Sequence, residues 1–440
     1  MILAFPSFKR PSLRRRAQVS IEAKQERAAA QTSVLILGDH RQSLTVIRSL
    51  ASAGFRVIFG SERASTVAAH SRFVSESWLH PPLLEAEEFV TTMVDFLEAR
   101  GDVSHVFPVG ESELDCLARH YARVSAHATL VMPEPQTVSV CLDKLQVYRR
   151  VSDLGLALPK TDSAFDLAQL LELAKDIRFP CIVKPRTSLH PFFGQKAVLC
   201  RTEEALTSSF AVWPTRQEAL IVQAWVAGAR YNCEFAAVNG RLVEYFEHKV
   251  VRSDRPDDLG VEVEGISVGP TKELQQSCEA LLVDLGYSGV GCVQFLVNER
   301  NGTNVFLEIN PRLDATCAFP WHYGCDLPRL AVEIAQGDKA LDRFPGTLPR
   351  YPTSKRVHWC LGDVRGWLHE VKRGEVRVGP SLVWLAKIVA SFLRANCHLT
   401  WWWKDPAPVV VLCRDLLAYA WRCLFRVSRK HTLSDRPVVN

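Results

Sequence analysis

Two patterns of hydrophobic and polar positions divide the chain. In its first third, short apolar runs that end in glycine alternate with stretches of helical period, and the clearest runs occupy 33–38, 55–60 and 105–110. Continuous apolar runs of this length are typical of strands buried on both faces of a parallel sheet. The pattern therefore predicts a small open α/β sheet over residues 32–133, with a helix at 111–122.

The middle of the chain has a different pattern, in which alternating runs are joined by Asn-Gly pairs. The two predicted hairpins pair 231–238 with 241–246 through Asn239-Gly240, and 290–297 with 305–309 through Asn301-Gly302. Asn-Gly between alternating runs is a strong hairpin signal, because both residues adopt positive φ readily. We expect an α+β region rich in antiparallel strands, preceded by a single helix at 136–158.

The end of the chain is aromatic and cationic. At 100° per residue, the predicted helix at 409–429 has all its charges on one face, and Leu412, Leu416, Leu424 and Val427 lie opposite. Such a helix contacts an anionic membrane surface, or it packs on the protein body or on a second subunit. We retain both interpretations for residues 381–430, which leaves a peripheral membrane contact and a homodimer as alternatives.

Charge is distributed unevenly, although the formal net charge is only +5. Residues 1–30 carry +5 and residues 404–440 carry +4, so the part between them is mildly acidic. A nucleic-acid-binding body would have its basic residues in the fold itself, and we expect no nucleic-acid partner. We interpret 1–31 as a basic flexible arm and 346–440 as an extension with amphipathic helices.

The cysteines indicate a reducing compartment. The chain has 13 of them, an odd number without a Cys-x-x-Cys pair, which favours reduced, mostly buried thiols. The N-terminus becomes basic without an apolar segment of the secretory type, and no apolar run is long enough to span a bilayer. We expect a cytoplasmic protein, with association at the inner face of the membrane as the alternative.

The strand at 305–309 and its partner contain a candidate metal site. Glu308 and Asn310 are two residues apart and face the same side of a strand, and Gln294 of the hairpin partner can face the same place. Oxygen donors of this kind suit Mg²⁺. Arg312 follows as a cation for phosphate oxygens. The alternative is an ordinary Glu/Asn pair at the end of an edge strand.

Two lysines strengthen the phosphate interpretation, although each alone is commonly a solvated side chain. Lys184 ends the apolar strand 179–185, where a charge is costly unless an anion meets it, and Lys144 follows Asp143 on a preceding helix. The loop after the first strand contains only Gly38 where a dinucleotide-binding turn needs three glycines. We therefore expect the first sheet to pack on the next domain and lend loops to its cleft.

Together these motifs resemble the ATP-grasp superfamily, and most closely its carbamoyl-phosphate-synthetase-like branch and related carboxylate–amine ligases. The resemblance covers about 135–335 and rests on four motifs in the family's order: Asp143-Lys144, the strand ending at Lys184, the hinge Leu220–Gly228, and the Gln294/Glu308/Asn310/Arg312 set. It implies an ATP-grasp domain over 134–345, preceded by the α/β domain that such proteins carry.

The resemblance also implies residue roles. Lys144 and Lys184 would reach the nucleotide phosphates, and the backbone of Gln223, Ala224, Trp225 and Val226 would read the adenine edge. Glu234, or alternatively a residue near Arg230, would face the ribose. Gln294, Glu308 and Asn310 would hold one or two Mg²⁺ ions, with Mn²⁺ as a substitute. Arg312 would steady the transferring phosphoryl group.

The implied reaction is ATP-dependent ligation. A substrate carboxylate attacks the γ-phosphate, and an amine then displaces phosphate from the acyl phosphate, with release of ADP. Both substrates would be small molecules. Arg252 is the second candidate catalytic residue, and Arg230, Lys249 and Arg255 are further candidates near the carboxylate, the alternative being solvated surface charge. Glu111 and Glu113 are expected to face the cleft or to stabilise a helix N-terminus.

One departure from the family pattern leaves alternatives open. The loop 186–196, which is usually rich in Gly and Ser, has a single glycine, so fewer backbone N–H groups can wrap a triphosphate. A catalytically weak nucleotide-binding module is therefore one alternative. A peripheral membrane or assembly protein that uses the fold as a scaffold is the other.

Overall fold

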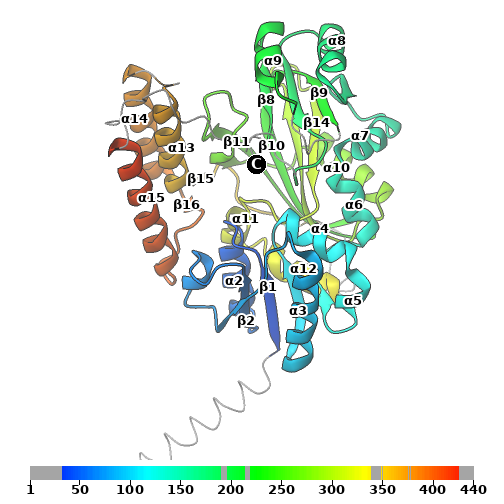
Figure 1. Cartoon of the computed structure of the whole chain (residues 1–440), viewed down its shortest axis with the longest axis vertical. Helices are drawn as coiled ribbons and strands as arrows, with labels where there is room; N and C mark the ends of the chain where they lie inside the picture. Colours follow the sequence, from blue (N-terminus) through cyan, green and yellow to red (C-terminus); the bar gives the residue numbers. More distant parts are fainter. Residues whose placement is uncertain are drawn as a thin grey trace, which may run out of the picture.

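The computed structural model describes residues 32–425 apart from 190–195, 214–218, 338–347, 349, 375 and 377. The expected arm at 1–31 and the end of the predicted helix at 426–429 lie outside the described residues, as does much of the loop 186–196. The described part contains three sheets with helices packed around them (Figure 1). No helix in that part has the length and apolar character needed to cross a bilayer.

The first sheet is the predicted open α/β sheet. Its five strands run parallel in the order β3-β2-β1-β4-β5. The strands are β1 (Ser33–Leu37), β2 (Arg56–Ser61), β3 (Glu76–Leu79), β4 (Val103–Pro108) and β5 (Thr129–Leu130). The helices are α2 (Ser43–Ser52), α3 (Ala86–Arg100), α4 (Glu111–Arg119) and α5 (Tyr121–Ser125), with the short turn η1 (Ala68–His70).

Two local predictions in this part of the chain were wrong. Strand β3 was missed because it is an edge strand with only Trp78 buried, so it lacks an apolar run. The single helix expected at 136–158 is two helices, α6 (Pro135–Leu142) and α7 (Lys144–Asp153). The break lies at Asp143, whose carboxylate accepts hydrogen bonds from the backbone N–H groups of Leu145 and Gln146 and thereby caps α7.

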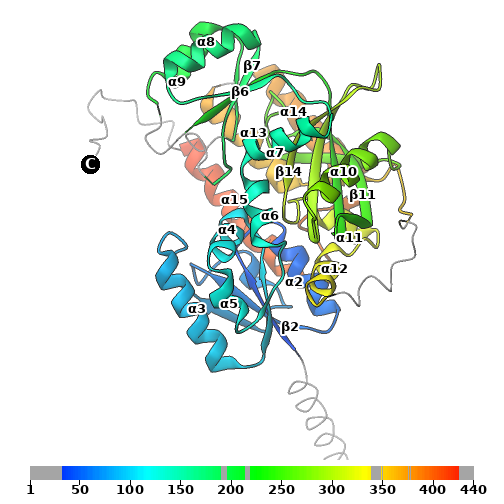
Figure 2. The same cartoon turned by 90° about the vertical axis from the view of Figure 1, so that its right-hand side faces the viewer.

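A four-stranded antiparallel sheet follows, in the order β6-β9-β7-β8. Its strands are β6 (Thr161–Ala164), β7 (Cys181–Pro185), β8 (Val198–Cys200) and β9 (Leu220–Ala224). Helices α8 (Leu167–Ile177) and α9 (Glu203–Phe210) cover one face with Leu170, Ala174 and Phe210. Figure 2 shows this small lobe at the top of the molecule, apart from the first sheet at the bottom.

The central sheet has seven strands in the order β14-β13-β10-β11-β12-β15-β16, antiparallel except for the β15–β16 pair. Its strands are β10 (Ala229–Val238), β11 (Arg241–Ser253), β12 (Glu262–Ser267), β13 (Gly289–Val297), β14 (Asn304–Asn310), β15 (Arg356–His358) and β16 (Cys397–His398). Helices α10 (Lys272–Asp284), α11 (Ala318–His322) and α12 (Leu327–Ala335) pack against it.

Both predicted hairpins are present in this sheet. Asn239 and Gly240 form the two-residue turn between β10 and β11 with φ of 49° and 80°, as a type I′ turn requires. A Cβ at Gly240 would lie 2.5 Å from the Cα of Val283, so a close backbone approach also demands glycine there. The fold class expected from the sequence is thus confirmed.

The C-terminal extension contributes two strands as well as helices. Strand β15 pairs with β12, and β16 pairs with β15, so the extension is part of the central sheet. Its helices are α13 (Cys360–Arg373), α14 (Val378–Arg394) and α15 (Ala407–Phe425), and α13 packs against the other two. In Figure 1 they form the left-hand edge of the molecule.

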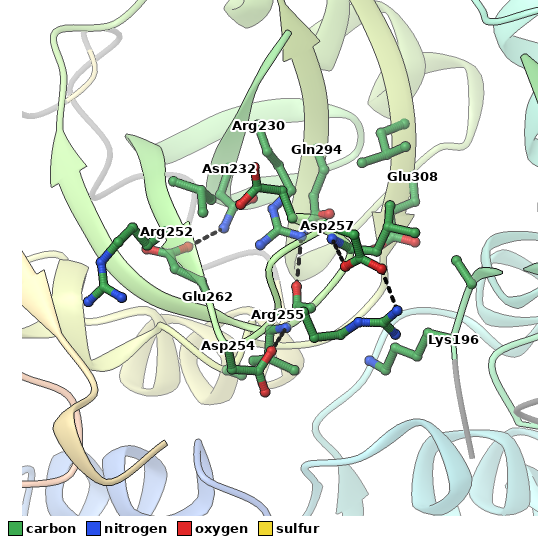
Figure 3. Close-up of a pocket in the computed structure, with 18 of the residues that line it drawn as sticks. Lys196, Arg230, Asn232, Arg252, Asp254, Arg255, Asp257, Glu262, Gln294 and Glu308 are labelled. Atoms are coloured by element: carbon green, nitrogen blue, oxygen red, sulfur yellow. Dashed lines mark hydrogen bonds and ion pairs between the residues drawn. The ribbon is translucent and has the colours of Figure 1, made fainter. Parts of the chain in front are cut away.

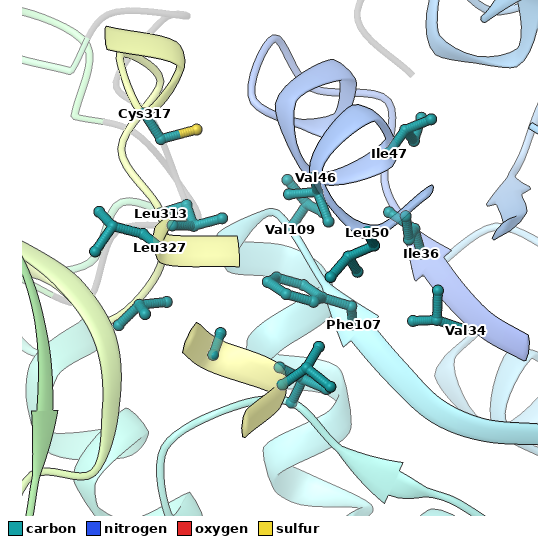
Figure 4. Close-up of a cluster of buried hydrophobic side chains, with 14 of the residues drawn as sticks. Val34, Ile36, Val46, Ile47, Leu50, Phe107, Val109, Leu313, Cys317 and Leu327 are labelled. Carbon is teal, nitrogen blue, oxygen red and sulfur yellow. The ribbon is translucent and has the colours of Figure 1, made fainter. Parts of the chain in front are cut away.

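A shared hydrophobic core joins the first sheet to the central one. Val34 and Phe107 of the first sheet belong to the same buried cluster as Ala236 of the central sheet and Leu313 and Leu327 beyond it. Figure 4 shows this cluster, in which α2 and the segment around Leu313 approach each other. The two domains therefore pack as expected, and this packing fixes the walls of the cleft between them.

Candidate functional site

A cavity of about 1260 Å³ lies among the three sheets. Its walls include Lys184 and Gln223 of the small sheet, Gln294 and Glu308 of the central sheet, and Arg41 of the first domain. The volume exceeds the ~300–1,000 Å³ of ordinary ligand pockets, so it has room for two ligands. Nearly all the residues singled out from the sequence lie on this one surface.

The candidate metal donors are brought together by strand register. Gln294 of β13 is the direct cross-strand partner of Glu308 of β14, and Asn310 follows on the same face with its Nδ2 3.5 Å from Glu308 Oε1. Figure 3 shows Gln294 and Glu308 on neighbouring strands at the cavity. The described residues contain no group of three His, Cys, Asp or Glu side chains able to hold a metal. The set is therefore one carboxylate and two amides, an all-oxygen combination that fits Mg²⁺.

Two buried lysines face the same cavity. Lys144 begins α7 and donates from Nζ to Ser188 Oγ at 3.0 Å, and Lys184 of β7 donates to Gln223 Oε1 at 2.9 Å. Burial lowers the pKa of each to about 8, and Glu308 opposes that shift in both. Within the described residues neither lysine forms a salt bridge, so the pair is suited to an anionic ligand.

Arg312 connects the central sheet to the first domain. Its Nη2 donates to Glu111 Oε1 at 2.5 Å, and both side chains are almost buried. Glu111 begins α4, so this expected cleft residue orients Arg312. Glu113 instead lies beside His40, whose Nε2 is 3.3 Å from its carboxylate. Arg312 Nε is buried without a hydrogen-bond partner in the described structure, which leaves one donor for a ligand.

The hinge after β9 lines the cavity over Gln223, Ala224, Trp225 and Val226. Two of its backbone donors are already engaged, because the N–H of Ala224 bonds the Lys160 carbonyl and that of Trp225 bonds the Pro180 carbonyl. Val226 N–H has no backbone partner in the described structure. Val226 therefore has the backbone donor of this segment that no described backbone carbonyl engages.

Glu234 does not reach the cavity. It is 0% exposed and accepts a hydrogen bond from Thr316 Oγ1 at 3.1 Å, and burial raises its pKa to about 8. Its position on β10 points it into the interior beside His248, 3.8 Å away. The structure thus does not bring it to the surface on which a ribose would lie.

The four basic residues expected near the substrate carboxylate all line the cavity, but each already has a carboxylate or a backbone carbonyl as its partner. Arg252 is held by Asp363 and by Glu264 at 2.9 Å. Lys249 binds Glu299 at 2.6 Å, Arg255 binds Asp257 at 2.5 Å, and Arg230 donates to the Gly260 carbonyl at 3.2 Å. Because Asp363 lies in the first turn of α13, Arg252 also secures the C-terminal extension.

The cavity also contains residues that sequence reasoning missed. Arg41 of the first domain stacks on Trp359 of the extension, with its guanidinium carbon 3.9 Å from the ring centroid. Arg365, His369 and Arg373 of α13 line the same end. No motif marks these positions, because they meet only after the extension folds back over the central sheet. The one available signal was the expectation that the loop after β1 reaches the cleft.

Comparison with known proteins identifies similar sequences and folds. A family model described as carbamoyl-phosphate synthase L chain, ATP binding domain, matches residues 263–343. The carbamoyl phosphate synthase large chain of Myxococcus xanthus is 23% identical over 305 residues, covering 66% of this chain and 27% of that protein. The chain thus spans roughly a quarter of the length of the curated relatives it matches.

Solved structures share the architecture. The biotin carboxylase domain of Hydrogenobacter thermophilus 2-oxoglutarate carboxylase has a TM-score of 0.57 at 17% identity, covering 70% of both chains. An N5-carboxyaminoimidazole ribonucleotide synthetase has a TM-score of 0.56 at 14% identity, covering 74% of this chain and 80% of that one. The chain thus shares its fold with a biotin carboxylase domain and with this synthetase. The chain is therefore similar in sequence to the ATP-binding domain of carbamoyl-phosphate synthase large chains, in agreement with the resemblance to the ATP-grasp superfamily expected from its motifs.

Proposed function

We propose that this protein is an ATP-dependent carboxylate–amine ligase that uses Mg²⁺. The observation that carries the proposal is the convergence of Gln294, Glu308, Asn310 and Arg312 with two buried lysines on one cavity. The structure from Hydrogenobacter thermophilus contains MgADP, which supports the choice of nucleotide and metal. The similar solved structures include a 2-oxoglutarate carboxylase domain and an N5-carboxyaminoimidazole ribonucleotide synthetase, which supports ligase chemistry without identifying a substrate.

The arrangement favours phosphoryl transfer by positioning and charge neutralisation. Lys144 and Lys184 would bind the phosphates, and Gln294, Glu308 and Asn310 would hold Mg²⁺, which would supply positive charge to offset that of the phosphates. Arg312 would stabilise the phosphoryl group as the substrate carboxylate attacks it. That attack would yield ADP and an acyl phosphate. The amine would then attack the acyl carbon and displace inorganic phosphate, so that the C–N bond forms and the amine loses a proton.

The second substrate would occupy the cavity end formed by Trp359, Arg365 and His369 of the extension. This end has groups of both signs, since Asp254 and Glu262 line it as well. A carboxylate and an amine both find complementary partners there. We also propose that the enzyme is cytoplasmic. Ten of the described cysteines are buried free thiols, and reduced thiols are typical of a reducing compartment.

Trapping with hydroxylamine tests the reaction type. The full chain is incubated with Mg·ATP, hydroxylamine and pools of carboxylates, and ADP release and hydroxamate formation are both measured. We expect at least one pool to give ADP and hydroxamate in equal amounts, because hydroxylamine intercepts an acyl phosphate. Tight ADP binding without turnover in any pool would instead favour a catalytically weak nucleotide-binding module.

The lowered lysine pKa values make nucleotide affinity pH-dependent. Both ammonium groups lose their protons as the pH rises through about 8, whereas phosphate binding needs the charged form. We expect the Kd of ADP, measured by calorimetry, to be nearly constant below about pH 7 and to rise up to ~10-fold per lysine per pH unit above about pH 8.

The Lys184→Arg variant is the matched control for this profile. A guanidinium stays charged over this range. In the variant, the Kd of ADP should therefore rise above about pH 8 with the dependence of one lysine instead of two. A profile that is flat up to about pH 9.5 in the unmodified protein would contradict the assignment of both lysines to the phosphates.

A further inference from the structure

Helix α14 presents an apolar face to solvent. Val378, Leu382, Val389 and Leu393 are 80%, 63%, 59% and 76% exposed. At 100° per residue these four side chains fall within an arc of about 60°. Ordinary exposed hydrophobic residues are scattered singly, whereas these form a continuous row along a helix of 17 residues.

The orientation of α14 is fixed from its other side. Ile388 and Ser391 are buried, Ser391 Oγ donates to Glu264 at 2.6 Å, and Trp384 Nε1 donates to Asp363 at 2.7 Å. These polar bonds join α14 to β12 and α13. The apolar row is therefore held outward by specific contacts and is part of the folded surface.

Helix α15 extends the apolar surface, although not with the residues expected from the sequence. Leu412 and Leu416, on the face expected to contact lipid or protein, are half-buried, and α15 packs on α13 and η1. The exposed apolar residues are instead Val410, Leu417 and Trp421, at 65%, 70% and 64%. Both helices thus expose apolar side chains. Figure 1 shows the two helices beside α13 at the left-hand edge of the molecule.

The charges of this part of the chain are nearly all positive, although Lys387 and Arg394 lie about 100–120° around α14 from its apolar row. Within 378–425 the exposed ionisable side chains described are five cations and one acid: Lys387, Arg394, Lys404, Arg414, Arg422 and Asp415. The remaining acid, Asp405, is fully buried. Trp401 and Trp403 are 51% and 71% exposed, and Lys404 lies over the Trp403 ring. A second copy of the same surface would place like charges together, whereas an anionic surface complements it.

We propose that the exposed faces of α14 and α15 form a peripheral docking surface for an anionic lipid bilayer. The apolar rows enter the headgroup region, the tryptophans lie at its boundary, and the cations contact lipid phosphates. This combination of an apolar face, flanking cations and boundary tryptophans is what an interfacial helix requires.

Vesicle co-sedimentation of the full chain tests the proposal. Vesicles of phosphatidylcholine are compared with vesicles that contain about 30 mol % phosphatidylglycerol. We expect binding to the anionic vesicles, weakened by salt, and a loss of at least ~10-fold in the Leu382→Glu/Leu393→Glu variant. The Lys387→Glu/Arg394→Glu variant should lose the preference for phosphatidylglycerol.

The Leu84→Glu/Val283→Glu variant is the matched control, because both residues are exposed, at 94% and 62%, on other parts of the molecule. It should bind vesicles as the unmodified chain does, and all variants should retain ADP binding if folded.

Analytical ultracentrifugation tests whether a second copy of the chain covers this surface instead of a bilayer. A dimer that Leu382→Glu/Leu393→Glu dissociates, without vesicle binding by the unmodified chain, would overturn the proposal in favour of a second copy. If vesicle binding appears only after deletion of 1–31 or 426–440, the proposal is overturned, and the deleted segment of the same chain occupies the apolar surface.

Discussion

Replacement of Glu308 by Ala is expected to lower Mg·ATP turnover by about 10³-fold or more. Glu308 is the one carboxylate in the Gln294/Glu308/Asn310 set, so its removal leaves two neutral amide oxygens that cannot neutralise a divalent cation. The phosphates would then lack the charge compensation on which phosphoryl transfer depends. Turnover is measured as ADP release with the acceptor identified by hydroxamate trapping.

Two controls make this result specific to the metal. Glu308 is only partly buried, so the variant should unfold at nearly the same denaturant concentration as the unmodified chain. Glu273→Ala removes an exposed glutamate on α10 and should leave turnover unchanged. If Glu308→Ala releases ADP at the unmodified rate in saturating Mg²⁺, the metal-site assignment is wrong.

The Arg48→Met variant is expected to lower the free energy of unfolding by about 3–5 kcal/mol. Arg48 Nε donates to Asp405 Oδ2 at 2.9 Å, and both side chains are at most 3% exposed. Asp405 also accepts hydrogen bonds from Ser71 Oγ at 2.7 Å and from Arg72 N at 3.0 Å. Without Arg48, a carboxylate would remain buried without its counter-charge, at the point where the extension meets the first domain.

Urea unfolding measures this loss, and limited proteolysis locates it, because release of the extension should make α15 the first site of cleavage. Arg329→Met is the matched control, since Arg329 forms an exposed i,i+4 pair with Glu333 whose loss costs below about 1 kcal/mol. The Arg48→Met/Asp405→Leu double variant should recover much of the stability, because no charge is then left buried. Equal losses in Arg48→Met and Arg329→Met would contradict this account of the anchor.

The helix break at Asp143 shows how local and tertiary information divide. The apolar period continues across 136–158 and predicts one helix, but the Asp143 carboxylate caps α7 and also binds Arg186. Its second partner lies 43 residues away, so periodicity carries no sign of it. The break places Lys144 at a helix start, where its side chain meets the cavity.

The sequence by itself determined the fold class and both Asn-Gly hairpins, because turn chemistry and strand period are local properties. It also singled out Glu308 and Asn310, whose two-residue spacing is local and which the structure places on one cavity. Tertiary structure alone decided that Glu234 is buried, that Arg252 holds the extension, and that Arg41 stacks on Trp359 at the far end of the cavity. It also decided which faces of α14 and α15 stay exposed. These features depend on contacts between residues far apart in the chain, and burial and charge pairing at such contacts are set only when the domains pack.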